Sequence, residues 1–194
     1  MKKRYRFFGG LLKTQERWLN QMSDKGYRLV RTGRLMYELE RCEPGKVRYC
    51  VEFIGQKSKE NAEDYREFLE DMGYRVFCKN INLGYSIGKA RWRPWAEKGG
   101  RIATDFTTRN RELLIVEKEN DGRPFELHTS CEDKGAYYSV LRNLWLFTLV
   151  LFAVAAIVCH SVIFGALTLA ALFPTALYEG QVMAAKREQK IREW

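Results

Sequence analysis

Apolar residues recur with the period of an α-helix in two segments, residues 14–25 and 61–72, so that each segment has one apolar face. Thr14 is placed to cap the first of these helices. Gly26 and Gly73 follow the two segments, and glycine readily takes the left-handed conformation that closes a helix. The pattern therefore predicts two amphipathic helices.

Other segments alternate apolar and polar residues with the period of a β-strand. Residues 43–46, Glu-Pro-Gly-Lys, have the composition of a turn, so we expect the strands on either side to pair as an antiparallel hairpin. The apolar run at residues 112–119 fits either a strand or a helix. The predicted strands are residues 3–8, 34–42, 47–53, 74–79 and 83–91, with one more after Gly26 and the last two forming a second pair.

A short internal repeat connects these elements. Residues 24–29 read Asp-Lys-Gly-Tyr-Arg-Leu, and residues 71–76 read Asp-Met-Gly-Tyr-Arg-Val. Helix, glycine, aromatic residue and strand thus recur in the same order. The element order βαββαβ plus an extra strand predicts an α+β fold of the ferredoxin-like type, with two helices on one face of an antiparallel sheet.

No residue between Arg142 and Glu179 carries a formal charge at pH 7. A continuous helix over this stretch would be roughly 50 Å long, whereas the hydrocarbon core of a bilayer is about 30 Å thick. We therefore predict a C-terminal transmembrane hairpin, residues 141–158 and 162–177, with a turn at 159–161. The alternatives are one long tilted helix, a half-inserted re-entrant hairpin, and a hairpin buried in a soluble core.

Flanking charges predict the orientation of this hairpin. Arg142 precedes it and four basic residues between 186 and 192 follow it, so both ends are expected in the cytoplasm. The apolar run at residues 7–12 is too short for a secretory signal, and nothing is expected to export the N-terminal domain. The prediction is a multi-pass protein of the bacterial cytoplasmic (inner) membrane with cytoplasmic N- and C-termini.

The same patterns divide the chain into four parts. The mean hydropathy is −0.40 because the apolar residues are concentrated in one part, and the remainder has the composition of a soluble protein. The predicted parts are a cytoplasmic α+β domain (1–100), a connector (101–139), two transmembrane helices (140–178) and a basic cytoplasmic tail (179–194).

Charge and cysteine content indicate partners and compartment. The formal net charge is +9, and residues 1–34 hold ten Lys or Arg against only Glu16 and Asp24, so anionic surfaces are the natural partners of this region. The five cysteines are odd in number and show no Cys-x-x-Cys spacing. They therefore suggest a reducing compartment rather than a disulfide framework or a zinc site.

One segment, residues 90–101, mixes tryptophans and cations around a proline. Such a segment can lie at a lipid interface, with tryptophan rings at headgroup depth and cations against anionic lipid. The alternative is that the two tryptophans cap the core of the sheet while the arginines are solvated. The residues predicted to contact the membrane surface are Arg91, Trp92, Arg93, Trp95, Lys98 and Arg101.

The inventory of catalytic and ligand-binding patterns is small. His128 has Cys131 three residues on, but further metal ligands or a supported Cys–His nucleophile are not visible. Asp105, in a Thr-Asp step, is typical of a cap or turn. No helix-turn-helix or RNP-like motif, Gly-rich phosphate loop or hydrolase elbow occurs. We therefore predict no catalytic, cofactor-binding or metal-binding residue, no cofactor, no specific nucleic acid partner and no enzyme activity.

Several of these residues resemble a bacterial family, domain of unknown function 2812. The resemblance covers roughly residues 1–110, and Tyr27 and Tyr74 stand where tryptophan is frequent in the family. The resemblance implies that membrane spans follow the domain. It also implies that the protein sits beside a PadR-type transcriptional regulator, as members of the family often do. The motifs that carry it are Glu16-Arg17-Trp18-Leu19, Met22, Gly26-Tyr27, Arg48-Tyr49-Cys50-Val51, Tyr65, Gly73-Tyr74 and Thr104-Asp105-Phe106.

The expected function follows from the anchor and the resemblance. We expect an integral membrane protein whose cytoplasmic domain is a regulatory or accessory interaction module linked to a transcriptional response, with membrane lipids and a protein as partners. The alternative is an enzyme or binding protein that acts on a lipid or a small membrane-soluble molecule, with a pocket in the α+β domain.

Overall fold

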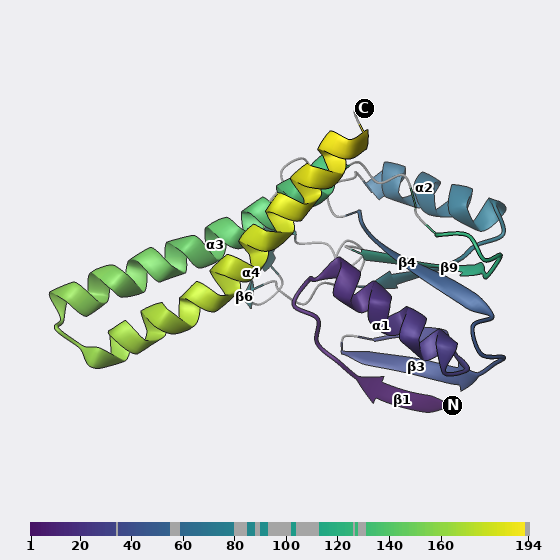
Figure 1. Ribbon diagram of the computed structural model, residues 1–194, viewed down its shortest axis with the longest axis horizontal. Helices are drawn as coiled ribbons and strands as arrows, with labels where there is room; N and C mark the ends of the chain where they lie inside the picture. Colours follow the sequence, from purple (N-terminus) through teal and green to yellow (C-terminus); the bar gives the residue numbers. More distant parts are fainter. Residues whose placement is uncertain are drawn as a thin grey trace. The chain divides into compact units, whose positions relative to one another are not determined.

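The computed structural model (Figure 1) describes residues 1–33, 35–54, 59–79, 85–87, 90–92, 102–103, 113–125, 127 and 131–192. The chain divides into two compact units, Met1–His128 and Thr129–Trp194. The first unit contains strands β1 (Lys2–Tyr5), β2 (Tyr27–Thr32), β3 (Met36–Arg41), β4 (Val47–Phe53), β5 (Arg75–Lys79), β6 (Tyr85–Ile87), β7 (Ala90–Trp92), β8 (Ile102–Ala103) and β9 (Leu113–Glu119), with helices α1 (Leu12–Asp24) and α2 (Lys59–Asp71).

The first unit is built from two βαββ modules. The N-terminal module is β1-α1-β2-β3, whose strands form an antiparallel sheet A in the order β1-β3-β2. The second module is β4-α2-β5-β9, whose strands form sheet B in the order β4-β9-β5. In both modules the last strand lies in the centre of the sheet. Strands β6, β7 and β8 form a small third sheet within the segment that separates β5 from β9.

The internal repeat predicted from the sequence corresponds to these modules. Gly26 and Gly73 follow α1 and α2 with φ of +76° and +83°, which L side chains rarely adopt. In the strand after each glycine, Arg28 lies opposite Glu40 and Arg75 lies opposite Glu117. The two arginines, and likewise the two glutamates, therefore occupy equivalent places in the modules.

The ferredoxin-like arrangement is not confirmed, because the strands form separate three-stranded sheets rather than one. The predicted hairpin of residues 34–42 and 47–53 is wrong: among the described strands, β3 pairs with β1 and β2, and β4 pairs with β9. The turn itself is present, with Gly45 at φ +70°, but it joins the two modules. The segment 112–119 contains the strand β9, so the first unit extends past residue 100 into the predicted connector.

Aromatic residues fill the core of the N-terminal module. The ring of Trp18 on α1 lies 4.9 Å from that of Tyr37 on β3 and 5.5 Å from that of Phe8, measured between centroids. Leu19, Leu29 and the other apolar residues of this face are also buried. Helix α1 begins after Leu11 without a side-chain cap, so Thr14 lies inside the helix and the predicted cap is wrong.

The core of the second module lies between α2 and one face of sheet B. Leu114 and Val116 of β9 are fully buried there. Because side chains alternate along a strand, Ile115 and Glu117 face the other side of the sheet. The cluster also contains Ile54, Ala62 and Leu69, with Tyr65, Tyr74, Val76, Cys78, Phe125 and Leu127 packed against it.

A polar stripe on α1 covers the outer edge of β4. Val47 O accepts a hydrogen bond from Ser23 Oγ at 2.6 Å, and Val51 N donates to Glu16 Oε2 at 3.0 Å. Between them, the Asn20 side chain bonds both the N–H (2.8 Å) and the carbonyl (3.0 Å) of Tyr49. Glu16, Asn20 and Ser23 lie on one face of the helix at helical spacing. The N-terminal module thereby satisfies backbone groups that an edge strand would otherwise leave unpaired.

The second unit is a hairpin of two long helices, α3 (Cys131–Val158) and α4 (Val162–Arg192). The predicted turn at residues 159–161 is confirmed, with His160 at φ +45°. Both helices are long and apolar enough to cross a membrane. The hydroxyls of Thr148, Thr168 and Thr175 bond to carbonyls one turn back in their own helices. These hydroxyls therefore need no water in an apolar environment.

The less exposed residues of each helix follow the spacing of a helical seam. At the base of the hairpin, Arg142 NH1 lies 2.9 Å from Glu179 Oε2. Near the turn, the rings of Phe152 and Phe164 are 6.4 Å apart. Along α4 the spacing of the less exposed residues alternates between four and three, as in packed helix pairs. On α4 the series is Phe164, Thr168, Ala171, Thr175, Tyr178, Val182 and Ala185.

Candidate functional site

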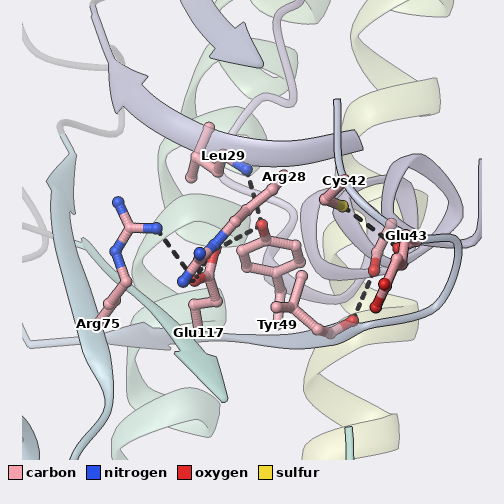
Figure 2. Close-up of polar contacts among 9 residues, drawn as sticks. Arg28, Leu29, Cys42, Glu43, Tyr49, Arg75 and Glu117 are labelled. Carbon is pink, nitrogen blue, oxygen red and sulfur yellow. Dashed lines mark hydrogen bonds and ion pairs between the residues drawn. The ribbon is translucent and has the colours of Figure 1, made fainter. Parts of the chain in front are cut away.

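A buried carboxylate, Glu117 on β9, receives an arginine from each module (Figure 2). Its side chain is only 1% exposed. Arg28 of β2 donates to Oε1 through Nε at 2.8 Å and through NH2 at 2.6 Å. Arg75 of β5 approaches the same oxygen from the other side through NH1, at 3.4 Å. The two equivalent arginines of the repeat thus meet on one glutamate.

Tyr49 of β4 forms a hydrogen bond with the second oxygen of this carboxylate. Its hydroxyl donates to Glu117 Oε2 at 2.7 Å and accepts the backbone N–H of Leu29 at 2.7 Å. Burial raises the pKa of Tyr49 well above its usual range, so the phenol keeps its proton at neutral pH. The side chain therefore links sheet B to an amide of β2, which lies at the edge of sheet A.

The chemistry of this cluster favours a structural role over a catalytic one. Both oxygens of Glu117 are engaged by donors within the described chain. The hydrogen bond from Arg28 to Glu117 raises the pKa of that guanidinium further, so it cannot exchange a proton near neutral pH. We interpret the Glu117 cluster as a polar clasp that sets the position of one module against the other.

Lys79 at the end of β5 is a second buried charge, and only 6% of the residue is exposed. Its ammonium donates to Gly33 O at 2.7 Å and lies 4.4 Å from the centroid of the Tyr37 ring. Beside it, Thr32 Oγ1 donates to Cys78 O at 3.0 Å. These contacts join the ends of β2 and β5. Burial lowers the pKa of Lys79 to about 8.

This lowered pKa predicts a pH dependence of stability. Above the folded-state pKa of about 8, the folded chain binds fewer protons at Lys79 than the unfolded chain, whose lysine titrates near 10.5. Stability contributed by this group should therefore rise with pH across that window. Relative to Lys79→Met, the native chain should gain about 2 kcal/mol between roughly pH 7 and pH 9.5.

The measurement is equilibrium unfolding of both proteins in the same detergent at each pH. Taking the difference between them cancels groups that titrate in both, including the other lysines and tyrosines. A difference that stays constant over this range would show that Lys79 titrates near its ordinary value.

Strand β4 also contains a buried thiol, Cys50, and a buried acid, Glu52. Burial raises the pKa of the Cys50 thiol to about 12, so it is not a thiolate at neutral pH. Glu52 Oε2 accepts a hydrogen bond from Tyr65 OH of α2 at 2.8 Å. Within the described part of the chain, no group of three or more His, Cys, Asp or Glu side chains is arranged to hold a metal ion.

Two surface grooves are formed by described residues of the N-terminal module. One, of about 420 Å³, is lined by Met1, Lys2, Tyr27, Leu39 and Arg41. In it the Lys2 ammonium donates to Tyr27 OH at 3.3 Å. The other, of about 300 Å³, is lined by Arg4, Tyr5, Arg6, Trp18, Met22 and Lys25. Both grooves are predominantly cationic and aromatic.

The segment predicted to contact the membrane surface is described only in part. Arg91 and Trp92 lie in β7, opposite Ser86 and Tyr85 of β6. Of the remaining predicted residues, Arg93, Trp95, Lys98 and Arg101 lie outside the described residues, as do His128 and Asp105. The membrane-surface assignment of this segment stays a prediction.

Sequence reasoning missed the clasp, although its signals are present. Glu117 is an acidic residue near the end of an apolar run, Leu-Leu-Ile-Val-Glu, where a charge needs a partner once buried. Arg28 and Arg75 are matched by the repeat itself. The pairing with Glu117 could not be read from either segment because β9 lies far from β2 in the chain.

Comparison with known proteins gives one result. A family model described as "Protein of unknown function (DUF2812)" matches residues 12–150. No curated protein and no solved structure matches the chain. The match begins at α1, covers the rest of both βαββ modules and enters α3, and it includes the motifs around Trp18, Tyr49 and Gly73. The chain therefore belongs to the DUF2812 family.

Proposed function

We propose that the chain is a membrane-anchored protein whose α+β unit serves as a regulatory or accessory interaction module. The observation that carries the proposal is the apolar hairpin of α3 and α4, which follows a folded α+β unit in the same chain. The proposed link to a transcriptional response rests on the regulators that often neighbour members of this family.

The outward surface of the hairpin supports a membrane location. Large apolar side chains stay exposed along both helices, which a soluble protein rarely tolerates. Lipid would cover them, while the inward hydroxyls are satisfied within the helices. The exposed residues include Phe147, Val150, Leu151, Val154 and Ile157 on α3, and Ile163, Leu169, Leu172 and Phe173 on α4.

The distribution of charge supports an orientation. Arg142 and Glu179 form an ion pair at the end of the hairpin opposite the turn, and Lys186, Arg187 and Lys190 lie beyond Glu179 on α4. We propose that this end faces the cytoplasm of a bacterium and the turn around His160 lies outside. Reporter fusions at residue 160 and at the C-terminus would then report opposite sides of the membrane.

The polar interior of the α+β unit supports an interaction role. The carboxylate of Glu117, the phenol of Tyr49 and the polar stripe of α1 are used to join the modules. The N-terminal module exposes a set of basic side chains, Lys3, Arg4, Arg6, Lys13, Arg17, Lys25 and Arg31. A stable domain with a charged surface is suited to binding a partner.

The alternative function, an enzyme or binding protein for a lipid or small membrane-soluble molecule, predicts a different result in the same experiment. The full chain, purified from membranes after chemical crosslinking, should carry a specific protein that an unrelated two-span membrane protein does not capture. Repeated absence of such a partner, together with measurable turnover of a lipid or small molecule by the purified chain, would replace the interaction module with the alternative.

A further inference from the structure

The smaller of the two grooves combines a cationic lining with aromatic side chains. Its lining comes from two segments: β1 and the residue after it supply Arg4, Tyr5 and Arg6, and α1 and the residue after it supply Trp18, Met22 and Lys25. The backbone N–H of Arg6 donates to Leu35 O at 2.9 Å, which holds this part of the strand beside the sheet. The groove is therefore made by regular elements of the module.

In the described part of the chain, no carboxylate is paired with the three cations of the groove, Arg4, Arg6 and Lys25. Neighbouring carboxylates are engaged elsewhere: Asp24 lies 2.7 Å from Arg48, and Glu38 lies 3.5 Å from Lys3. No described carboxylate forms an ion pair with any cation of this groove. Three positive charges around about 300 Å³ would attract an anion.

Arg6 is already positioned for such a ligand. Its guanidinium lies over the rings of Phe8 and Trp18, 5.4 Å and 5.6 Å from their centroids. Stacking on aromatic faces fixes the plane of the guanidinium while leaving its N–H groups able to donate at the edge. A phosphate group matches this geometry because it can accept two such bonds from one arginine.

Exposed apolar side chains accompany these cations. Tyr5, which lines the groove, is 73% exposed, and Phe7, two residues further along the chain, is 59% exposed. Aromatic rings beside cations are the combination found where proteins touch the headgroup region of a bilayer. A soluble phosphate ester would leave these exposed apolar side chains in water.

We propose that this groove binds the phosphate of anionic phospholipids at the membrane surface. The choice of a membrane lipid as the source of this phosphate rests on the proposed function, because the hairpin would keep the unit near a bilayer. Residues 120–130 link β9 to α3 and span no more than about 40 Å even when extended. Such a tether raises the effective concentration of headgroups, so the groove needs only modest affinity.

The test uses the full chain in lipid nanodiscs, with p-benzoylphenylalanine in place of Tyr5. After illumination, lipid attached to the N-terminal peptide is measured by mass spectrometry. Discs of phosphatidylcholine containing about a third phosphatidylglycerol should give strong attachment, and pure phosphatidylcholine much less. Replacing Arg4, Arg6 and Lys25 by glutamine should lower the attachment at least about tenfold, since each cation near an anionic surface contributes roughly a fivefold factor.

A matched variant removes equal charge elsewhere in the module, at Lys13, Arg17 and Arg31, and should retain most of the attachment. Equal loss in both variants would show diffuse attraction and overturn the groove as a site, as would attachment that ignores phosphatidylglycerol. Displacement by glycerol phosphate at about millimolar concentration would reassign the groove to a soluble ester. Failure of the hairpin to enter the discs would instead reject the proposed membrane location, and the lipid source with it.

Discussion

Replacing Glu117 by alanine should destabilise the first unit by about 3–4 kcal/mol. The carboxylate is buried, and its removal leaves Tyr49 OH without its acceptor and two guanidiniums without their shared partner. Breaking a buried ion pair typically costs about 3–5 kcal/mol. The lower part of that range applies because Arg28 and Arg75 keep part of their side chains in water.

Two further substitutions test whether the effect depends on the negative charge at residue 117 and on the buried position of that residue. Glu117→Gln keeps the shape and one acceptor for Tyr49, so we expect a loss of about 2 kcal/mol. Glu40→Ala removes the equivalent glutamate of the N-terminal module, which is only half-buried and lies opposite Arg28, and should cost less than about 1 kcal/mol. Thermal unfolding in detergent, followed by near-ultraviolet circular dichroism, gives the three values. If alanine at 117 cost no more than alanine at 40, the clasp would not stabilise the unit.

Replacing Gly26 by alanine should destabilise the unit by about 2–4 kcal/mol. Its φ of +76° alone costs an L side chain roughly 1–2 kcal/mol. A Cβ there would also lie 3.0 Å from the carbonyl oxygen of Cys42, a backbone atom that cannot move aside alone. That backbone is held in place, because Cys42 N–H donates to Gly26 O at 3.0 Å.

Gly73→Ala is the matched control, because Gly73 has the same place in the second module. Its φ is +83°, but a Cβ there meets nothing within 4 Å. We therefore expect only the conformational cost, about 1–2 kcal/mol. Denaturant unfolding of the two variants side by side measures the difference. Equal losses of stability would mean that the turn after β3 can shift at little cost. The close approach of the new Cβ to Cys42 would then add nothing to the destabilisation.

The local elements were predictable because their signals are local. Apolar spacing places α1 and α2 within a few residues of their observed bounds, and Gly26 and Gly73 end them in the expected conformation. The uncharged stretch after Arg142 predicted two helices and the turn between them. The start of α1 was misplaced because Thr14 is a good cap by type, whereas Leu11 precedes the helix without any side-chain cap.

Strand pairing was not predictable from the same signals. The turn after β3 has hairpin composition, yet β4 pairs with β9, which comes some sixty residues later. A strand alternating apolar and polar residues does not specify its neighbour, and helix α1 covers the edge of β4 that a hairpin partner would have used. The Glu117 clasp depends on that long-range pairing, so it became visible only with the fold.

The position of β9 between β4 and β5 has a consequence for biosynthesis. As the chain leaves the ribosome, β4, α2 and β5 emerge before β9, the strand that lies between β4 and β5 in sheet B. These two strands therefore cannot complete their pairing until residue 119 has been synthesised. Among the described residues, the next regular segment to appear is α3. Completion of the α+β unit and delivery of the apolar helices therefore fall close together in time, and a delay in either would expose unpaired strand edges to the crowded cell.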